Sequence, residues 1–252
     1  RDEHPDRLFF SYANTVATID FSKRYKGHGW VGIRFQLDPK QKEFDEIVLH
    51  LRFKQNEARL QQETLGIVGV NLIYGAFYKY HKPRKLLKYL YDHIDKDILE
   101  IDMINFSGPN FDHVDNRLMS LQLIKNDMTD AVMFGPDGNN LLPAAVLYKK
   151  NILALRGSFR PVTKVNMDMF QKSYDIFVRE QTVDQENTIV IFEITLSNLK
   201  SSGEIDEQDF MDRAELLCSL GHIVMISKFS EYYKVVEYFN NYTKNRIGLT
   251  MG

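Results

Sequence analysis

A short loop rich in glycine, hydroxyl and basic side chains is the part of this sequence best suited to chemistry. It spans residues 156–168, between an apolar run that ends at Leu155 and a segment from Met167 with apolar side chains at helical spacing. Such a turn suits an anion, because a helix N-terminus has unpaired N–H groups and glycine admits a close ligand. Its basic residues are Arg156, Arg160 and Lys164. We expect a phosphate site here, with an ordinary strand-to-helix connection as the alternative.

Two carboxylates are expected at the same edge of the predicted sheet, where strands end and ligands bind. Asp137 lies in the turn at residues 135–138 and is a candidate ligand for a divalent metal. Turn formation alone is its alternative role. Glu193 lies within the apolar strand at residues 189–195, where an unpaired carboxylate is costly. We therefore expect either a catalytic role for Glu193 or an ion pair with Arg156.

The loop also resembles a known motif. The run Gly157-Ser158-Phe159-Arg160-Pro161-Val162-Thr163, followed by Asp168, resembles the opening motif of the pantetheine-phosphate and nicotinate-nucleotide adenylyltransferases. That motif reads Gly-Ser/Thr-Phe-Asp-Pro-Val/Ile-Thr-x-Gly-His-x-Asp, and its His binds the ATP phosphates. Here Asn166 replaces the His, Val165 replaces the Gly and Arg160 replaces the Asp. The resemblance covers about residues 151–252, and only its first dozen residues are specific.

The resemblance implies adenylyl transfer that uses ATP and magnesium, with a phosphorylated small molecule as partner. Asn166 would hold phosphates with the help of Thr163, and Lys200 stands roughly where the family keeps a basic residue for its second substrate. The residues expected to bind the ligand are Arg156, Gly157, Ser158, Arg160, Lys164 and Lys200. Asparagine can donate a hydrogen bond but cannot carry the positive charge of a histidine.

The whole chain is similar to a bacterial protein family found mainly in Bacteroidetes. Residues 100–108, 133–140 and 206–220 carry this likeness. Members usually bear the label nicotinate-nucleotide adenylyltransferase and sometimes TonB-dependent receptor. The receptor label conflicts with the alternation of strands and helices, because outer-membrane barrels consist of many alternating strands.

Composition excludes several classes of protein. The 252 residues carry a net charge of -2, which favours neither nucleic acid nor an anionic membrane as partner. The sequence has no apolar span long enough to cross a bilayer and no signal peptide, and its single cysteine, Cys218, indicates a reducing compartment. We therefore expect a cytoplasmic protein, with a homo-oligomer suggested by its 13 Tyr and 17 Phe residues. Both ends look like cuts through a longer protein.

The order of apolar segments predicts an α/β fold. Residues 30–37 and 44–53 indicate an antiparallel hairpin within a first region, 1–55. Residues 56–252 then predict a helix over 57–80 and a mostly parallel sheet of about six strands that alternate with helices. We favour a Rossmann-like open sheet over a barrel. The expected strands are 99–105, 131–135, 152–159, 188–195, 222–228 and 246–251.

Three functions compete at this stage. The first is binding of a phosphorylated small molecule or nucleotide at the strand ends, with adenylyl transfer as its most specific form. The second is a non-catalytic α/β module of a larger protein, which the altered motif favours. The third is a different enzyme on a barrel-like fold that uses the strand-end carboxylates Asp102, Asp137 and Glu193.

Overall fold

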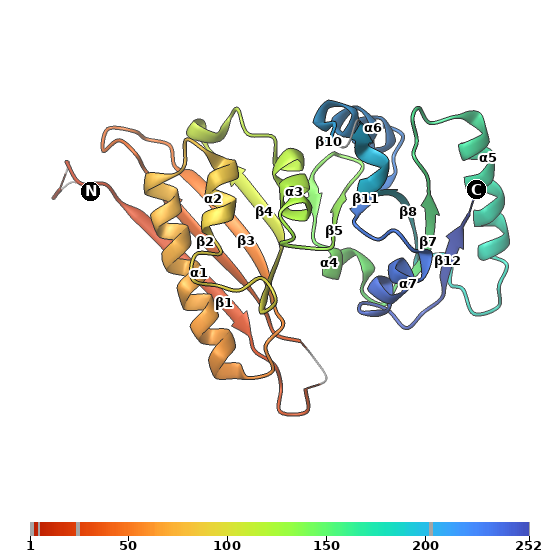
Figure 1. Ribbon diagram of the computed structural model, residues 1–252, viewed down its shortest axis with the longest axis horizontal. Helices are drawn as coiled ribbons and strands as arrows, with labels where there is room; N and C mark the ends of the chain where they lie inside the picture. Colours follow the sequence, from red (N-terminus) through yellow and green to blue (C-terminus); the bar gives the residue numbers. More distant parts are fainter. Residues whose placement is uncertain (1–2, 5, 24–25, 202–203, 252) are drawn as a thin grey trace. The chain divides into compact units, whose positions relative to one another are not determined.

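The computed structural model describes residues 3–4, 6–23, 26–201 and 204–251, without the side chains of residues 200, 201 and 204. It divides into two compact units, Arg1–Thr129 and Asp130–Gly252 (Figure 1). The sequence instead predicted a boundary near residue 55. The difference arises because the strand expected at 99–105 pairs with the N-terminal hairpin.

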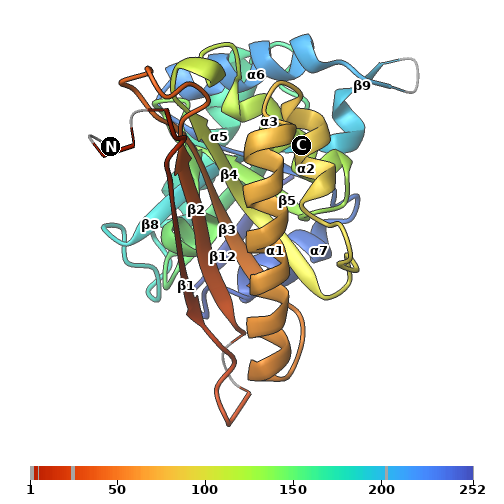
Figure 2. The ribbon, with the colours of Figure 1, turned by 90° about the vertical axis from the view of Figure 1, so that its left-hand side faces the viewer.

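The N-terminal unit is a four-stranded antiparallel sheet in the order β1-β2-β3-β4, with helices packed on one face (Figure 2). Its elements are β1 (Phe10–Ala17), β2 (His28–Phe35), β3 (Asp45–Phe53), α1 (Ala58–Tyr78), α2 (Pro83–Tyr89), β4 (Leu99–Ser107), a 3-10 turn (Pro109–Phe111) and α3 (Asn116–Lys125). Alternate strand residues such as Ile33, Leu49 and Ile104 are buried beneath the helices. The opposite face carries polar and charged side chains.

Helix α1 confirms the helix expected over 57–80, and its glycines set how closely it packs. A Cβ built on Gly69 would lie 2.2 Å from the Tyr12 hydroxyl, and one on Gly75 would lie 3.0 Å from Leu86. A side chain at position 69 therefore fits only if the Tyr12 side chain moves. The glycines at positions 69 and 75 of α1 thus allow the helix to lie close to β1 and α2.

The C-terminal unit is a six-stranded sheet in the order β12-β7-β8-β11-β5-β6. Its elements are β5 (Ala131–Phe134), β6 (Asn140–Leu141), α4 (Pro143–Leu147), β7 (Asn151–Arg156), α5 (Lys164–Phe177), β8 (Thr188–Thr195), a 3-10 turn (Leu196–Leu199), β9 (Lys200–Ser201), β10 (Glu204–Ile205), α6 (Glu207–Ser219), β11 (Ile223–Ser227), α7 (Tyr232–Asn240) and β12 (Ile247–Thr250). β9 and β10 form a separate two-stranded pair. Ile191 faces a core shared with α4 and α7, whereas its neighbour Phe192 contacts Phe170 of α5.

The mostly parallel sheet was predicted correctly in part. Strands β12, β7, β8 and β11 are mutually parallel. The strand expected at 131–135 is β5, which instead runs antiparallel to β11 and turns directly into β6. The strand expected at 99–105 lies in the other sheet. Within the described residues neither sheet closes into a barrel, so the barrel alternative does not apply there.

Among the helices of the described residues, none is both long and apolar enough to pass through a bilayer.

Candidate functional site

The first candidate site is the loop between β7 and α5, where the sequence predicted a phosphate. Arg156 at its start is engaged by Glu193 on the neighbouring strand β8: Nε donates to Oε2 at 2.5 Å and Nη2 to Oε1 at 3.1 Å. Arg156 also donates to the backbone carbonyls of Phe229 and Ser230, at 2.9 and 3.1 Å. Its guanidinium lies 4.7 Å from the centre of the Tyr232 ring. Two roles were expected for Glu193, and these contacts show the ion pair with Arg156.

Burial sets the electrostatics of this pair. Burial raises the pKa of the Glu193 carboxyl, while hydrogen bonds from Arg156 and Ser227 lower it. The Ser227 hydroxyl donates to Oε1 at 2.5 Å. Each oxygen of Glu193 therefore has a partner within the protein, and the carboxylate is bound internally rather than presented to a ligand.

The glycine turn itself is filled by a side chain. The Gly157 N–H donates to the Glu193 carbonyl at 3.1 Å, and the Ser158 carbonyl accepts from Arg213 Nη1 at 2.8 Å. Phe159 is 2% exposed and adopts a positive φ of 46°. A Cβ built on Gly157 would lie 2.8 Å from the Phe159 ring. The glycine therefore makes room for Phe159.

Thr163 and Asn166 cap helix α5. Asn166 Oδ1 accepts from the Thr163 N–H at 2.9 Å and from its hydroxyl at 2.8 Å. The Asn166 N–H donates back to Thr163 Oγ1 at 3.3 Å. This reciprocal pattern is a capping box, which satisfies N–H groups at the helix start. The structure brings the two predicted residues together, and their described contacts serve the helix.

The remaining predicted residues do not converge on one point. Arg160 Nε lies 3.3 Å from Asp209, which Arg213 also contacts, and Lys164 is exposed on the first turn of α5. The Lys200 side chain lies outside the described residues. Asp137 accepts from the N–H and the side-chain amide of Asn139, at 3.1 and 2.8 Å.

The contacts of Asp137 agree with the turn role expected for it. Its hydrogen bond from the Asn139 backbone lowers the pKa of Asp137 and closes the turn between β5 and β6. The described residues contain no cluster of three or more His, Cys, Asp or Glu side chains fit for a metal. In that part of the chain no such cluster accompanies Asp137, and the expected metal site there stays a prediction.

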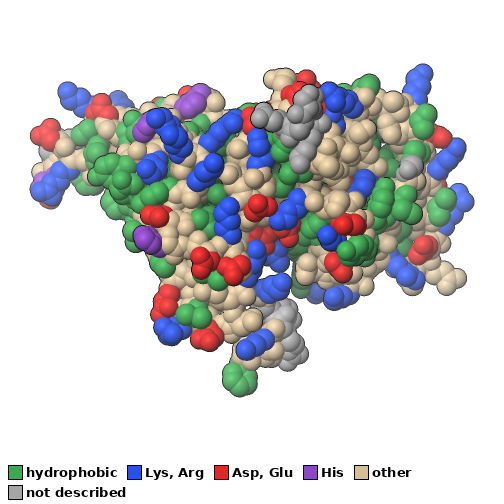
Figure 3. Space-filling model, in the orientation of Figure 1, with side chains coloured by type: hydrophobic (Ala, Val, Ile, Leu, Met, Phe, Trp, Pro, Cys, Tyr) green, Lys and Arg blue, Asp and Glu red, His purple; other side chains and the backbone are tan. Residues whose placement is uncertain are grey.

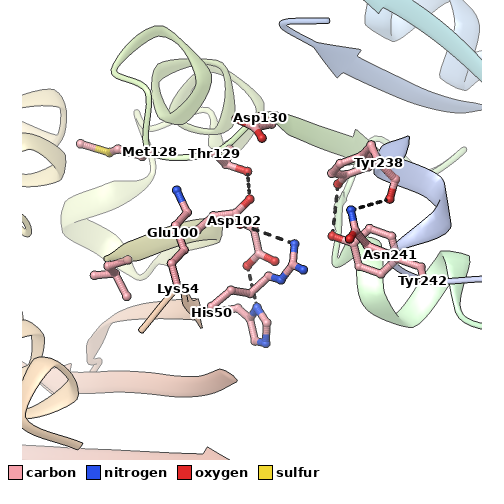
Figure 4. Close-up of polar contacts among 12 residues, drawn as sticks. His50, Lys54, Glu100, Asp102, Met128, Thr129, Asp130, Tyr238, Asn241 and Tyr242 are labelled. Atoms are coloured by element: carbon pink, nitrogen blue, oxygen red, sulfur yellow. Dashed lines mark hydrogen bonds and ion pairs between the residues drawn. The ribbon is translucent and has the colours of Figure 1, made fainter. Parts of the chain in front are cut away.

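A second candidate site lies on the face of the N-terminal sheet opposite its helices. His50 of β3 and Asp102 of β4 point toward one another, with Nδ1 and Oδ1 2.6 Å apart (Figure 4). Both side chains are almost fully buried, at 2% and 1% exposure. His50 Nε2 lies 3.3 Å from Nδ1 of His28, which is exposed on β2. These three residues form a chain from a buried carboxylate to an accessible imidazole.

A β-bulge in β4 creates this arrangement. His50 pairs with Met103 and Leu51 pairs with Ile101, so Asp102 has no residue opposite it. The extra residue places Asp102 and Met103 on the same side of the sheet, whereas Ile101 and Ile104 are buried on the other side. Bulges commonly re-aim a side chain in this way. The sequence signal is the change of phase in the apolar pattern between residues 101 and 104.

Neighbouring charges surround this second site. Arg52 contacts Glu100 at 3.5 Å, and the Thr129 hydroxyl donates to the other oxygen of Glu100 at 2.8 Å (Figure 4). Burial lowers the pKa of His28, the nearby His50 and Arg52 lower it further, and Asp102 opposes them. His28 is therefore mostly neutral at neutral pH.

A third feature is a pair of pockets beside helix α2. One, of about 390 Å³, is lined by Lys79, Lys85, Lys88, Tyr89, Tyr91 and Asp92. The other, also about 390 Å³, is lined by Lys82, Pro83, Arg84, Lys85, His113, Val114, Asp115, Leu118 and Met119. Lys and Arg side chains gather over this part of the unit (Figure 3). The basic segment at residues 79–88 was not among the predicted sites, because the net charge of the whole chain is close to zero.

Comparison with known proteins gives no information on the function of this chain. No protein-family model, curated protein or solved structure matches the chain. The likeness of residues 157–168 to an adenylyltransferase motif therefore stays a prediction.

Proposed function

We propose that this chain binds a phosphorylated small molecule, of which a nucleotide is one form, in the first pocket beside α2. The single observation that carries the proposal is a pocket with three lysines and one aspartate in its wall, Lys79, Lys85, Lys88 and Asp92. A volume of about 390 Å³ lies within the range of small-molecule sites. The expected class of ligand is thus retained, and its expected place moves from the β7–α5 loop to α2.

The charge of this pocket is available to a ligand. In the described part of the chain, the ammonium groups of Lys85 and Lys88 have no carboxylate partner, and both side chains are exposed. They lie three residues apart on α2 and therefore project from the same side of the helix. Two such cations provide the point charges that a phosphate group needs. By contrast, Arg156 in the β7–α5 loop is already neutralised by Glu193.

An aromatic wall completes the pocket. Lys79 Nζ lies 4.9 Å from the centre of the Tyr89 ring and 5.5 Å from that of Tyr74. The two rings are themselves 4.9 Å apart. The cation–π contacts hold Lys79 and Tyr89 together at the edge of the pocket. A planar base could stack on this wall while the lysines bind its phosphate, which favours a nucleotide over inorganic phosphate.

Adenylyl transfer at the β7–α5 loop stays a narrower prediction, and a non-catalytic module is its alternative. Both are compatible with nucleotide binding at α2, but only the transferase requires Arg160, Lys164 and Asn166 to contact phosphate. A catalytic role would further require ATP and magnesium to bind together. The experiment must therefore separate the two places on the chain.

The test is isothermal titration of the whole chain with inorganic phosphate, AMP and ATP, the last with and without magnesium. We expect Lys85→Glu/Lys88→Glu to weaken nucleotide binding about tenfold or more, equivalent to about 1.4 kcal/mol. Because the contacts are exposed, added salt should weaken binding by the intact protein as well. The matched control is Lys40→Glu/Lys42→Glu, which makes the same change of charge on exposed loop residues of the same unit.

A third variant, Arg160→Gln/Lys164→Gln, distinguishes the two sites. Nucleotide affinity that falls in this variant and not in the α2 variant places the ligand at the β7–α5 loop. Equal loss in the α2 variant and in the control shows that only net charge matters. Absence of heat with every ligand at millimolar concentration contradicts the proposal.

A further inference from the structure

We propose that Asp102, His50 and His28 form a proton relay that makes His28 a general base for a substrate hydroxyl or a water molecule. This inference concerns the opposite face of the N-terminal sheet from α2 and does not depend on the pocket there. His28 is the catalytic residue, because its imidazole is the accessible end of the chain. His50 and Asp102 are positioning residues that act through it.

The hydrogen-bond geometry assigns the tautomers. An ionised Asp102 can only accept, so the proton on the 2.6 Å contact belongs to His50 Nδ1. His50 Nε2 is then an acceptor, and the 3.3 Å contact requires a proton on His28 Nδ1. His28 Nε2 is therefore left with a lone pair directed away from the relay. That nitrogen is the basic atom of the site.

Proton transfer through the chain balances without a co-reactant. The hydroxyl proton moves to His28 Nε2 while the His28 Nδ1 proton moves to His50 Nε2. His28 stays neutral, His50 becomes an imidazolium beside Asp102, and the substrate becomes an alkoxide or hydroxide. No electrons are exchanged. The positive charge thus forms at a buried position next to a carboxylate rather than at the surface, which stabilises the charged state.

An unsatisfied carboxylate oxygen is an independent sign that the relay is functional. Asp102 Oδ2 is buried and has no hydrogen-bond partner among the described residues. Leaving such an oxygen unpaired costs free energy, and buried exceptions of this kind require an explanation. A carboxylate that stabilises an imidazolium on His50 provides one. The bulge that turns Asp102 toward His50 has the same explanation.

Small, exposed side chains lie beside His28 on the neighbouring strand. Across from His28 and Trp30, strand β1 carries the small side chains of Ala17 and Thr15, both exposed. The Trp30 ring lies 4.8 Å from the His50 ring and forms an apolar wall. Among the described residues, Arg52 and Glu100 are charged neighbours of the relay and contact each other. The positive charge of Arg52 disfavours protonation of the nearby His28 and lowers its pKa.

The first test needs no variant. Long-range proton–nitrogen spectra of the histidine rings at pH 7.5 should show His28 protonated on Nδ1 and unprotonated on Nε2, with His50 protonated on Nδ1. The exposed histidines His81 and His113 serve as references in the same sample. A His28 ring protonated on Nε2 at this pH would overturn the relay.

The second test measures nucleophilicity at His28 Nε2 by modification with diethyl pyrocarbonate and mass spectrometry. The nitrogen attacks a carbonyl carbon of the reagent, an N–C bond forms, and the C–O bond to the leaving group, ethyl carbonate, breaks. Ethyl carbonate then decomposes to carbon dioxide and ethanol. At pH 7.5, well above the pKa of His28, we expect His28 to react several-fold faster than His81 and His113. Asp102→Asn and His50→Gln should bring His28 to the reference rate.

Matched controls separate the relay from a structural effect. Glu46→Gln changes a charged residue paired with Arg34 on the same face and should leave the His28 rate unchanged. The reference histidines correct for the amount of active reagent, and circular dichroism reports whether each variant is folded. An unchanged His28 rate in folded Asp102→Asn or His50→Gln contradicts the proposal. If neither variant folds, the tautomers of the intact protein decide.

Discussion

Arg156 and Glu193 form a doubly hydrogen-bonded ion pair between β7 and β8 in a buried position. The carboxylate is 1% exposed and the guanidinium 9% exposed. Burial raises the pKa of Glu193 in spite of its partner, so removal of the two charges from water is not fully offset by their attraction. The strand register Arg156↔Glu193 makes them direct neighbours in the parallel sheet. The pair therefore gives orientation at that position more than it gives stability.

The first prediction concerns the two halves of this pair. Arg156→Met should destabilise the protein by about 3–5 kcal/mol, because it leaves Glu193 as an uncompensated buried charge. The double variant Arg156→Met/Glu193→Leu should recover most of that loss. Urea unfolding of both variants and of Glu193→Leu gives the coupling free energy. A double variant as unstable as Arg156→Met alone would show that packing at Arg156, rather than charge, dominates.

The second prediction concerns the cap of α5. Thr163→Ala and Asn166→Ala should each destabilise the protein by about 1 kcal/mol, because each removes half of the capping box. Neither should change nucleotide affinity. The matched control is Asn240→Ala at the exposed end of α7, where no cap is lost. Loss of nucleotide binding in Asn166→Ala, with little loss of stability, would instead support adenylyl transfer at this loop.

The residues of this cap are of the types that also suit a phosphate site. A threonine followed three residues later by a polar side chain suits a capping box as well as an anion site, and one sequence does not separate them. The decisive residue is Phe159, whose buried ring fills the space beside Gly157. That contact depends on tertiary packing. The ion pair of Glu193 was predictable, because a carboxylate in an apolar strand requires a partner.

The fold was predictable where local pattern decides it. The hairpin, α1 and the strands β7, β8, β11 and β12 follow from apolar runs and turns. The direction of β5 was not predictable, since a short apolar run is the same in parallel and antiparallel sheets. Likewise, β4 joins β3 only after two intervening helices, and the contact of His50 with Asp102 spans 52 residues and one bulge. Such long-range pairing leaves little local signal.

The third prediction concerns acid stability. His222 stacks on Phe192, with ring centres 4.2 Å apart, and burial lowers the pKa of His222. The unfolded chain therefore binds a proton more readily than the folded one. Stability should fall as pH drops below about 6.5 and reach its full loss below the lowered folded value.

The measurement is urea unfolding at pH 7.5, 6 and 5. His222→Phe should flatten the decline, because no proton need enter the stack. Part of the decline should remain, since the pKa of His28 is lowered in the same direction. His113→Gln, at an exposed position, should follow the intact protein. An unchanged slope in His222→Phe would assign the acid sensitivity to other groups.

The fourth prediction concerns the turn that follows β4. Gly108 has a φ of 110°, and a Cβ there would lie 2.5 Å from the Phe44 carbonyl oxygen and 2.7 Å from Asp45 Cα. Asp45 is fully buried and accepts from the backbone N–H and the side-chain amide of Asn110, at 2.9 and 2.7 Å. A side chain at position 108 therefore strains the backbone and pushes against this network.

Gly108→Ala should destabilise the protein by roughly 1–3 kcal/mol from backbone strain alone, with a further cost where Asp45 is displaced. The matched control is Gly66→Ala in α1, where a Cβ meets nothing within 4 Å. That change should stabilise the protein by about 0.5–1 kcal/mol, because alanine favours a helix interior. Thermal unfolding of the two variants should thus shift in opposite directions. A Gly108→Ala protein as stable as the parent would mean that the turn relaxes to accept a side chain. In that case the hydrogen bonds of Asp45 would not hold residues 108–110 rigidly against β3.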